Sequence, residues 1–170
     1  YAINALLGKR DIIYKTKNSF ISSTFWTERS GPTAALKVIE IMKRDKTQKF
    51  IMSQGKKIKK FWIDMSLKYS LNMEISGLDA LCKFSFNKNN DKIRTFITQE
   101  MLKKKILATN TVYLSIDHKD NVLDEYFDKI EGVFKRLSNT NLESDIERLL
   151  EHPVINSDFR RSNWFQIQRF

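Results

Sequence analysis

Apolar residues follow a helical spacing in the first half of the chain and again after residue 90, with an alternating pattern between the two regions. The helical spacing predicts helices over residues 10–15, 32–46, 47–70, 91–105, 122–137 and 142–150. Alternation predicts strands over residues 73–76, 80–86 and 111–116, and an apolar run predicts a buried strand over residues 2–7. This arrangement indicates an α+β fold, in which helices cover a small antiparallel sheet of about three strands, preceded by a long helix.

The helix predicted over residues 47–70 carries the densest run of positive charge, KKIKKFW at residues 56–62. The chain has 30 Lys and Arg against 20 Asp and Glu, a net charge of +10. Cations beside aromatic residues are typical of proteins that bind single-stranded nucleic acid. On a helix, however, Trp62 falls on the apolar side and the lysines on the other side. We therefore favour a solvated lysine face, and keep a basic nucleic-acid-binding module as the alternative function.

Composition sets broad limits on the class of protein. With 170 residues, 41% of them hydrophobic, the chain is long enough to bury a core. The single Cys82 excludes an internal disulfide and a cysteine-based metal site, and it suits the reducing cytoplasm. The sequence contains no apolar run long enough to span a membrane, and its His, Cys, Asp and Glu residues show no metal-ligand spacing. A cytoplasmic protein without a metal is expected.

Residues 20–32, FISSTFWTERSGP, combine hydroxyls and aromatics directly ahead of a helix start. A helix N-terminus favours an anion because its first N–H groups have no partner within the helix. Neighbouring Ser and Thr hydroxyls add neutral donors for phosphate oxygens. The alternative interpretation is a loop that only caps the next helix.

This segment resembles the cofactor-phosphate loop of class III, fold type I aminotransferases that depend on pyridoxal 5'-phosphate (PLP), particularly the glutamate-1-semialdehyde aminomutase-like branch. Further blocks resemble the same family in the same order: YAINALLGKRDI at residues 1–12, FITQEML at 96–102, YLSIDH at 113–118, LLEHPV at 149–154 and FRR at 159–161. The resemblance implies transfer of an amino group between an amino donor and a carbonyl acceptor, with PLP as cofactor, in a homodimer.

The resemblance also implies a domain organisation. Residues 1–32 would be the edge of the PLP-binding large domain with its phosphate loop, and residues 33–170 the C-terminal small domain. The family's Schiff-base lysine would lie before Tyr1, so we expect a C-terminal fragment with no catalytic residue of its own, inactive when isolated. Lys9, in a Gly-Lys-Arg-Asp turn, is not a replacement. Apolar side chains around Leu6 and Leu7 are then expected to be exposed in the isolated chain.

The family binds the cofactor phosphate partly through a Thr that crosses the dimer interface, within a Thr-x-x-Gly-Asn-Pro pattern. Counting back from Gly31 assigns this role to Thr27, whereas matching the Ser-Thr-Phe triplet assigns it to Thr24, beside Ser23. Both assignments stay open. This sequence departs from the pattern because it lacks the Asn between Gly31 and Pro32.

Two further residues have candidate roles. Arg29 is the candidate for binding a substrate carboxylate or phosphate through its planar guanidinium, the alternative being an ion pair with Glu28 or a neighbouring chain. His118 occupies the His of the family's Ala-His-Thr position and is interpreted as structural, with Asp117 or Asp120 capping the following helix. A purely structural dimerisation domain is a further alternative for the whole chain.

Overall fold

The computed structural model of the chain describes residues 3–19, 27–142 and 144–155. The chain divides into two compact units, Tyr1–Thr47 and Gln48–Phe170, which are described one at a time. The assignment of residues 1–32 and 33–170 to a large and a small domain stays a prediction.

The first unit contains α1 (Arg10–Tyr14), a 3-10 turn η1 (Lys15–Asn18) and α2 (Ser30–Asp45), which confirms the two helices predicted here. The strand predicted over residues 2–7 is wrong for the part that the structure describes, because residues 3–9 form neither helix nor strand. A strand requires a neighbour to pair its backbone N–H and C=O groups, and no described segment supplies one.

No large apolar side chain among the described residues of the first unit is buried. Apolar residues that expose more than a third of their surface are Ile3, Leu6, Leu7, Ile12, Tyr14, Leu36, Val38, Ile39 and Met42. The apolar exposure predicted around Leu6 and Leu7 is therefore confirmed, at 64% and 86%. The described part of this unit has no hydrophobic core of its own.

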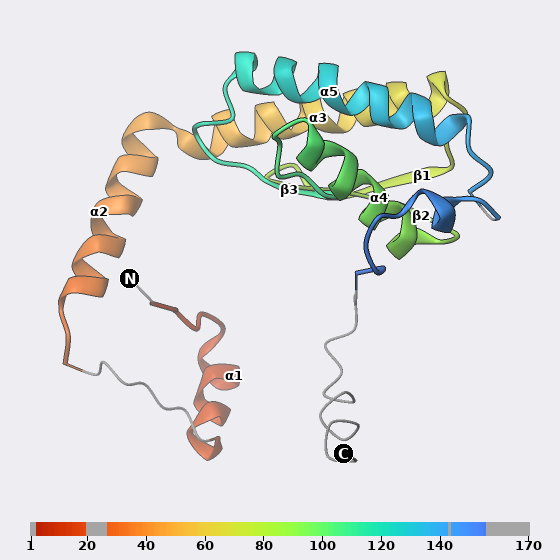
Figure 1. Ribbon diagram of the computed structural model, residues 1–170. Helices are drawn as coiled ribbons and strands as arrows, with labels where there is room; N and C mark the ends of the chain where they lie inside the picture. Colours follow the sequence, from red (N-terminus) through yellow and green to blue (C-terminus); the bar gives the residue numbers. More distant parts are fainter. Residues whose placement is uncertain (1–2, 20–26, 143, 156–170) are drawn as a thin grey trace. The chain divides into compact units, whose positions relative to one another are not determined.

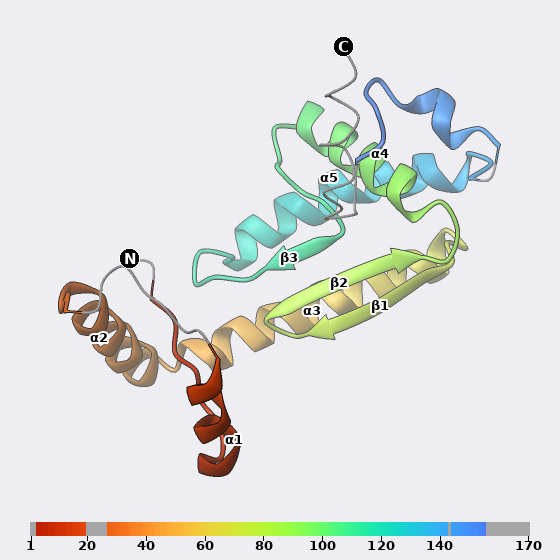
Figure 2. The same ribbon diagram turned by 90° about the horizontal axis from the view of Figure 1, so that it is seen from below.

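The second unit is a helical layer on a small sheet (Figures 1 and 2). Its elements are α3 (Thr47–Lys68, which begins at the unit boundary), β1 (Met73–Leu78), β2 (Leu81–Phe86), α4 (Asn90–Lys103), β3 (Thr111–Tyr113), α5 (Asp120–Ser138) and a 3-10 turn η2 (Ile146–Leu149). The sheet is antiparallel with the order β1-β2-β3, and α3 and α5 lie on one of its faces. The predicted α+β class and the three-stranded antiparallel sheet are confirmed.

Helices α3 and α5 run parallel to each other, as the contacts between them show by following the same order along both helices. Gln54 Nε2 lies 2.8 Å from Asp120 Oδ1, Trp62 Nε1 lies 3.1 Å from Tyr126 Oη, and Lys68 Nζ lies 2.6 Å from Glu131 Oε1. Burial raises the pKa of Tyr126 far above its usual range, so its hydroxyl remains a neutral acceptor for the Trp62 N–H.

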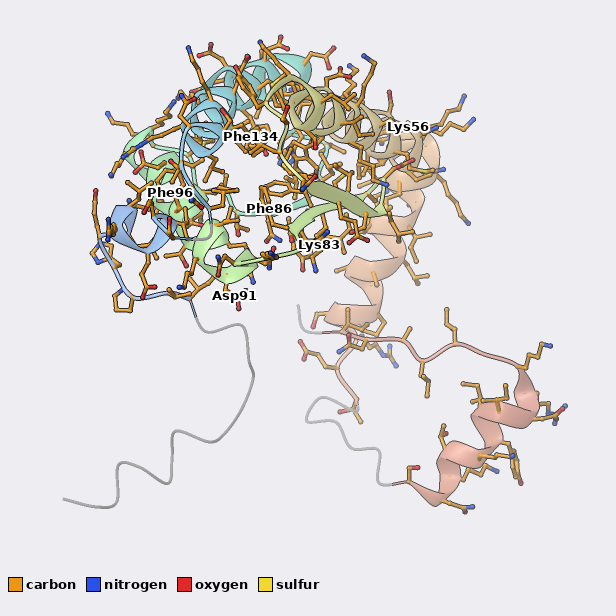
Figure 3. The ribbon with its side chains drawn as sticks, turned by 90° about the vertical axis from the view of Figure 1, so that its right-hand side faces the viewer. Lys56, Lys83, Phe86, Asp91, Phe96 and Phe134 are labelled. Carbon is orange, nitrogen blue, oxygen red and sulfur yellow. The ribbon has the colours of Figure 1, made fainter. Side chains whose placement is uncertain are left out.

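Phe84 lies at the centre of the core that joins the sheet to the helices. Its ring meets the rings of Trp62, Phe134 and Phe86 edge-on, with centroids 4.8, 5.8 and 6.1 Å away. Edge-to-face pairs at these distances add stability beyond the area that they bury. Cys82 and Phe86 lie on the same buried face of β2, whereas Lys83 lies on the opposite, exposed face (Figure 3). The predicted alternation along β2 is confirmed.

The hairpin between β1 and β2 lies against α3 at its turn. The turn is Asp79-Ala80, because Leu78 pairs with Leu81, so β1 ends two residues later and β2 begins one residue later than predicted. Gly77 lies inside the strand with φ +82, a conformation that a glycine adopts without strain. A Cβ atom on Gly55 of α3 would lie 1.6 Å from the carbonyl oxygen of Asp79, so only glycine permits this close approach.

Two predicted elements are shorter in the structure. β3 ends at Tyr113 rather than at residue 116, and Ile116 beyond it is 55% exposed. The sheet pairing nevertheless begins before β3, because the buried Asn110 accepts from Phe84 N–H and donates its Nδ2 to Phe84 C=O at 2.7 Å. The helix predicted over residues 142–150 is the single 3-10 turn η2.

Substitution of Gly55 by alanine tests the close approach of α3 and the hairpin. We expect Gly55→Ala to lower the free energy of unfolding by about 3 kcal/mol or more, because the Cβ meets backbone rather than a movable side chain. The matched control is Gly132→Ala in α5, where the nearest neighbour is the flexible end of Lys104 at 3.1 Å. Helix propensity should make this control more stable by roughly 0.5–1 kcal/mol. Guanidinium unfolding followed by far-UV circular dichroism compares the two, and a neutral Gly55→Ala would contradict the described packing.

Glu100 links α4 to α5 and to the segment after η2. Its carboxylate accepts from Lys103 Nζ at 2.8 Å and from Gln99 Nε2 at 3.1 Å, and it also pairs with Arg136. Burial raises the pKa of Glu100, but the hydrogen bonds from Lys103 and Gln99 and the charge of Arg136 outweigh it, so the pKa lies below its usual range. Gln99 in turn accepts from Glu151 N–H at 2.8 Å, which holds the segment after η2 against α4.

The lowered pKa of Glu100 predicts a contribution to stability that depends on pH. This contribution is fully present above the unfolded-state pKa of about 4.3 and is lost as pH falls through the lower folded-state pKa. We expect Glu100→Gln to cost about 1–3 kcal/mol at pH 7 and to reduce the loss of stability on acidification. Urea unfolding between pH 7 and pH 3 measures both effects. Glu74→Gln on the exposed face of β1 is the control, expected within about 0.5 kcal/mol of the parent at every pH.

Candidate functional site

The start of α2 presents backbone donors that the helix does not use. Thr33 N–H closes the first turn on Arg29 C=O at 2.9 Å, and Pro32 has no N–H. The N–H groups of Ser30 and Gly31 therefore have no partner within the helix, and the side chain of the N-cap residue Arg29 forms no capping hydrogen bond. Gly31 is buried, with Ile3 as its nearest side-chain neighbour. This geometry suits an anion at the N-terminus of α2.

The exposed residues directly before α2 include two of the predicted site residues, Thr27 and Arg29. The carboxylate of Glu28 accepts a hydrogen bond from the hydroxyl of Ser30. No ion pair joins Glu28 to Arg29, both of which the structure describes, so the alternative of an ion pair inside this loop is not formed. Thr27 and Arg29 are thus close together along the chain at the helix start, and both are accessible. The other predicted residues, Ser23 and Thr24, lie outside the described residues.

His118 belongs to the turn that precedes α5. Its Nδ1 accepts from Ser115 N–H at 3.0 Å, and Ser115 Oγ accepts from Asp117 N–H at 3.2 Å. These local bonds support the structural interpretation of His118. The predicted cap is wrong, since no side chain caps α5, and the Asp120 carboxylate instead accepts from Gln54 and from Lys57 at 2.6 Å.

The lysine-rich run of α3 does not present its aromatic residues to solvent. Trp62 is fully buried, and Phe61 stacks on Phe127 with ring centroids 4.2 Å apart. Ion pairs join lysines of the run to acidic residues: Lys57–Asp120, Lys59–Asp79 and Lys60–Asp64. Lys59 is therefore only partly solvated, unlike the prediction, whereas Lys56 lies on the outside (Figure 3). Within the run at residues 56–62, nucleic-acid bases therefore find no exposed aromatic ring to stack on.

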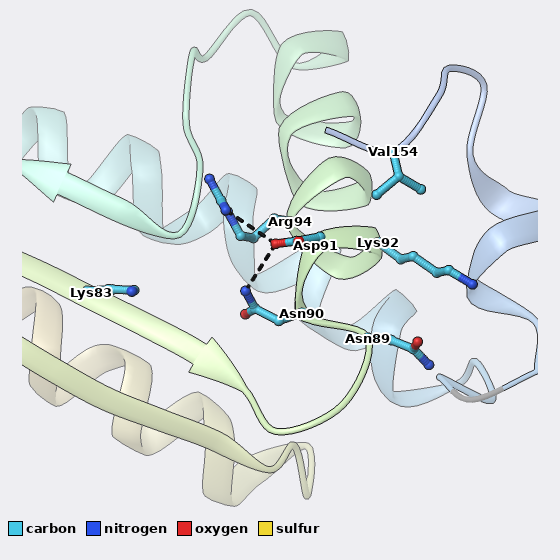
Figure 4. Close-up of a pocket in the computed structure, with 7 residues that line it drawn as sticks. All are labelled: Lys83, Asn89, Asn90, Asp91, Lys92, Arg94 and Val154. Carbon is cyan, nitrogen blue, oxygen red and sulfur yellow. Dashed lines mark hydrogen bonds and ion pairs between the residues drawn. The ribbon is translucent and has the colours of Figure 1, made fainter. Parts of the chain in front are cut away.

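Sequence reasoning missed an open pocket at the first turn of α4. Its volume is about 700 Å³, and it is lined by Lys83, Asn89, Asn90, Asp91, Lys92, Arg94 and Val154 (Figure 4). Arg94 Nη1 lies 3.4 Å from the Asp91 carboxylate, and Lys92 pairs with Glu147 at 2.6 Å. None of the predicted site residues lines this pocket. The polar run NKNND at residues 87–91, ahead of a helix, is the signal that marks it in the sequence.

Other functional features are not found in the part of the chain that the structure describes. No three His, Cys, Asp or Glu side chains there come close enough to hold a metal ion. None of the described helices is long and apolar enough to cross a membrane. The Cys82 thiol donates to the backbone oxygens of Gly55 and Asp79 at 3.4 and 3.3 Å, and burial raises its pKa, which favours the protonated form.

Comparison with known proteins identifies relatives by sequence and by fold. No protein-family profile matches the chain. It is 40% identical over 58 residues to the 3-aminobutyryl-CoA aminotransferase of Cloacimonas acidaminovorans (strain Evry), a match that covers 34% of this chain and 14% of that protein. The chain resembles an aminotransferase.

The fold likeness extends further along the chain. The FumI protein of Sphingopyxis sp. MTA144, solved in its PLP internal aldimine form, matches 78% of this chain with a TM-score of 0.65 and 16% sequence identity. The α+β fold is thus that of the C-terminal region of fold type I PLP enzymes, and the predicted resemblance to PLP-dependent aminotransferases is confirmed. The matched parts span 33% of FumI and 14% of the aminotransferase.

Removal of the Thr27 hydroxyl should leave the folded chain as stable as before. Thr27 is exposed and forms no hydrogen bond with another described residue, so Thr27→Ala is expected within about 0.5 kcal/mol of the parent in chemical unfolding. Gln54→Ala is the positive control, since it removes buried bonds to His118 C=O and Asp120 and should cost about 1–3 kcal/mol. A Thr27→Ala loss as large as that of the control would identify Thr27 as a structural cap instead.

Proposed function

We propose that this chain is the C-terminal part of a PLP-dependent aminotransferase or aminomutase of class III, in the glutamate-1-semialdehyde aminomutase-like branch. The observation that carries the proposal is the start of α2, where accessible hydroxyl and guanidinium groups lie beside unused backbone donors. Similarity to an aminotransferase and the fold of a PLP enzyme support the same class. The enzyme moves an amino group between a small amino donor and a carbonyl acceptor.

The residues at the start of α2 fit the phosphate of PLP. A phosphate dianion requires several neutral donors, and the hydroxyl of Thr27 with the N–H groups of Ser30 and Gly31 supplies them. Thr24 and Ser23 stand as the alternative hydroxyls. PLP, when bound, supplies the electron sink for amino-group chemistry, and the role of this loop is to hold the phosphate so that the ring stays oriented. As in the family, the loop would serve the partner's cofactor in a homodimer.

Residues 48–155 have a scaffolding role in this proposal. They carry no predicted catalytic group, and the resemblance assigns no residue of this sequence to the Schiff-base lysine. We therefore expect the chain by itself to show no turnover with PLP and an amino donor.

Substitution of the candidate hydroxyls tests the cofactor-phosphate site. In the complete protein that carries this sequence, we expect Thr27→Ala to raise the Kd for PLP by roughly 10–150-fold, the loss expected for one hydrogen bond to a charged group. Thr24→Ala and Ser23→Ala, measured in parallel, show which hydroxyl meets the phosphate. Absorbance titration with PLP gives the Kd of each variant.

The matched control for these variants is Thr33→Ala. Thr33 is exposed in the first turn of α2, six residues after Thr27, and should retain the parental affinity for PLP. If PLP binds and none of the Ser23, Thr24 and Thr27 variants weakens it, this segment is not the phosphate site. A purely structural dimerisation role for the chain would then be favoured.

Arg29 is proposed to bind a carboxylate of the amino acceptor. We expect Arg29→Gln to raise KM for a carboxylate-bearing acceptor about 10-fold or more while kcat changes little, because the planar fork contributes to binding and not to proton transfer. Arg44→Gln at the other end of α2 is the control, since Arg44 already pairs with Asp45 at 2.7 Å and should leave KM unchanged. Steady-state kinetics with saturating PLP distinguish the two. An unchanged KM in Arg29→Gln would remove Arg29 from the substrate site without affecting the phosphate assignment.

A further inference from the structure

We draw no further inference here: the strongest candidate, the open pocket at the first turn of α4 lined by Lys83, Lys92 and Arg94, carries nothing because carboxylates already pair with Lys92 and Arg94, the unpartnered Arg94 Nε is closed off from solvent, and no second observation among the described residues points to a ligand.

Discussion

The second unit depends on one close approach, that of the Asp79 carbonyl to the backbone of Gly55. The absence of a side chain at Gly55 lets the turn of the β1–β2 hairpin rest directly on α3. Lys59 then donates to the carbonyl oxygen of Gly77 at 2.6 Å and to the Asp79 carboxylate at 3.0 Å, one helical turn further along. With the hairpin held at its turn, β2 directs Phe84 at the gap between the parallel helices, where its ring meets those of Trp62 and Phe134. The sheet and the helical layer are thus fixed together at two points, a polar contact at the hairpin turn and an aromatic cluster further along β2.

The two units differ in how they can be stabilised. Residues from Ile58 to Ile146 supply every buried large apolar side chain among the described residues, so the second unit has the core of an independently stable domain. The described part of the first unit leaves the apolar face of α2 in contact with water, and a helix of 16 residues gains little stability without tertiary packing. Apolar surface of this kind is typical of an interface with other protein surface, and the proposed homodimeric PLP enzyme would provide one.

The spacing of apolar residues alone predicted most of the second unit, because its helices and strands bury side chains at regular intervals along the sequence. Trp62 and Met65 of α3, and Cys82, Phe84 and Phe86 of β2, lie where the spacing placed them. Two of the errors occur where a non-local contact overrides a local signal. The hairpin turn lies where the chain packs closely against Gly55 and not at Gly77. The Asp120 carboxylate binds groups on α3 instead of capping α5. Neither partner lies near in sequence, so a pattern confined to one segment contains no information about them.

The candidate site was recognised by a different kind of signal. Thr27 and Arg29 are exposed, and neither side chain forms a hydrogen bond or an ion pair with another described residue. Folding therefore does not require a hydroxyl or a guanidinium at these positions, and neither periodicity nor burial predicts them. Only the combination of donors ahead of a helix start, together with a family resemblance, selects them. By contrast, the pocket at α4 was missed because its cations come from β2 and α4, which only the folded sheet brings to one place. The carboxylates of Glu147 and Asp91 pair with Lys92 and Arg94 of this pocket, whereas the N–H groups of Ser30 and Gly31 have no partner within α2, and this difference supports the proposed placement of ligand binding at α2.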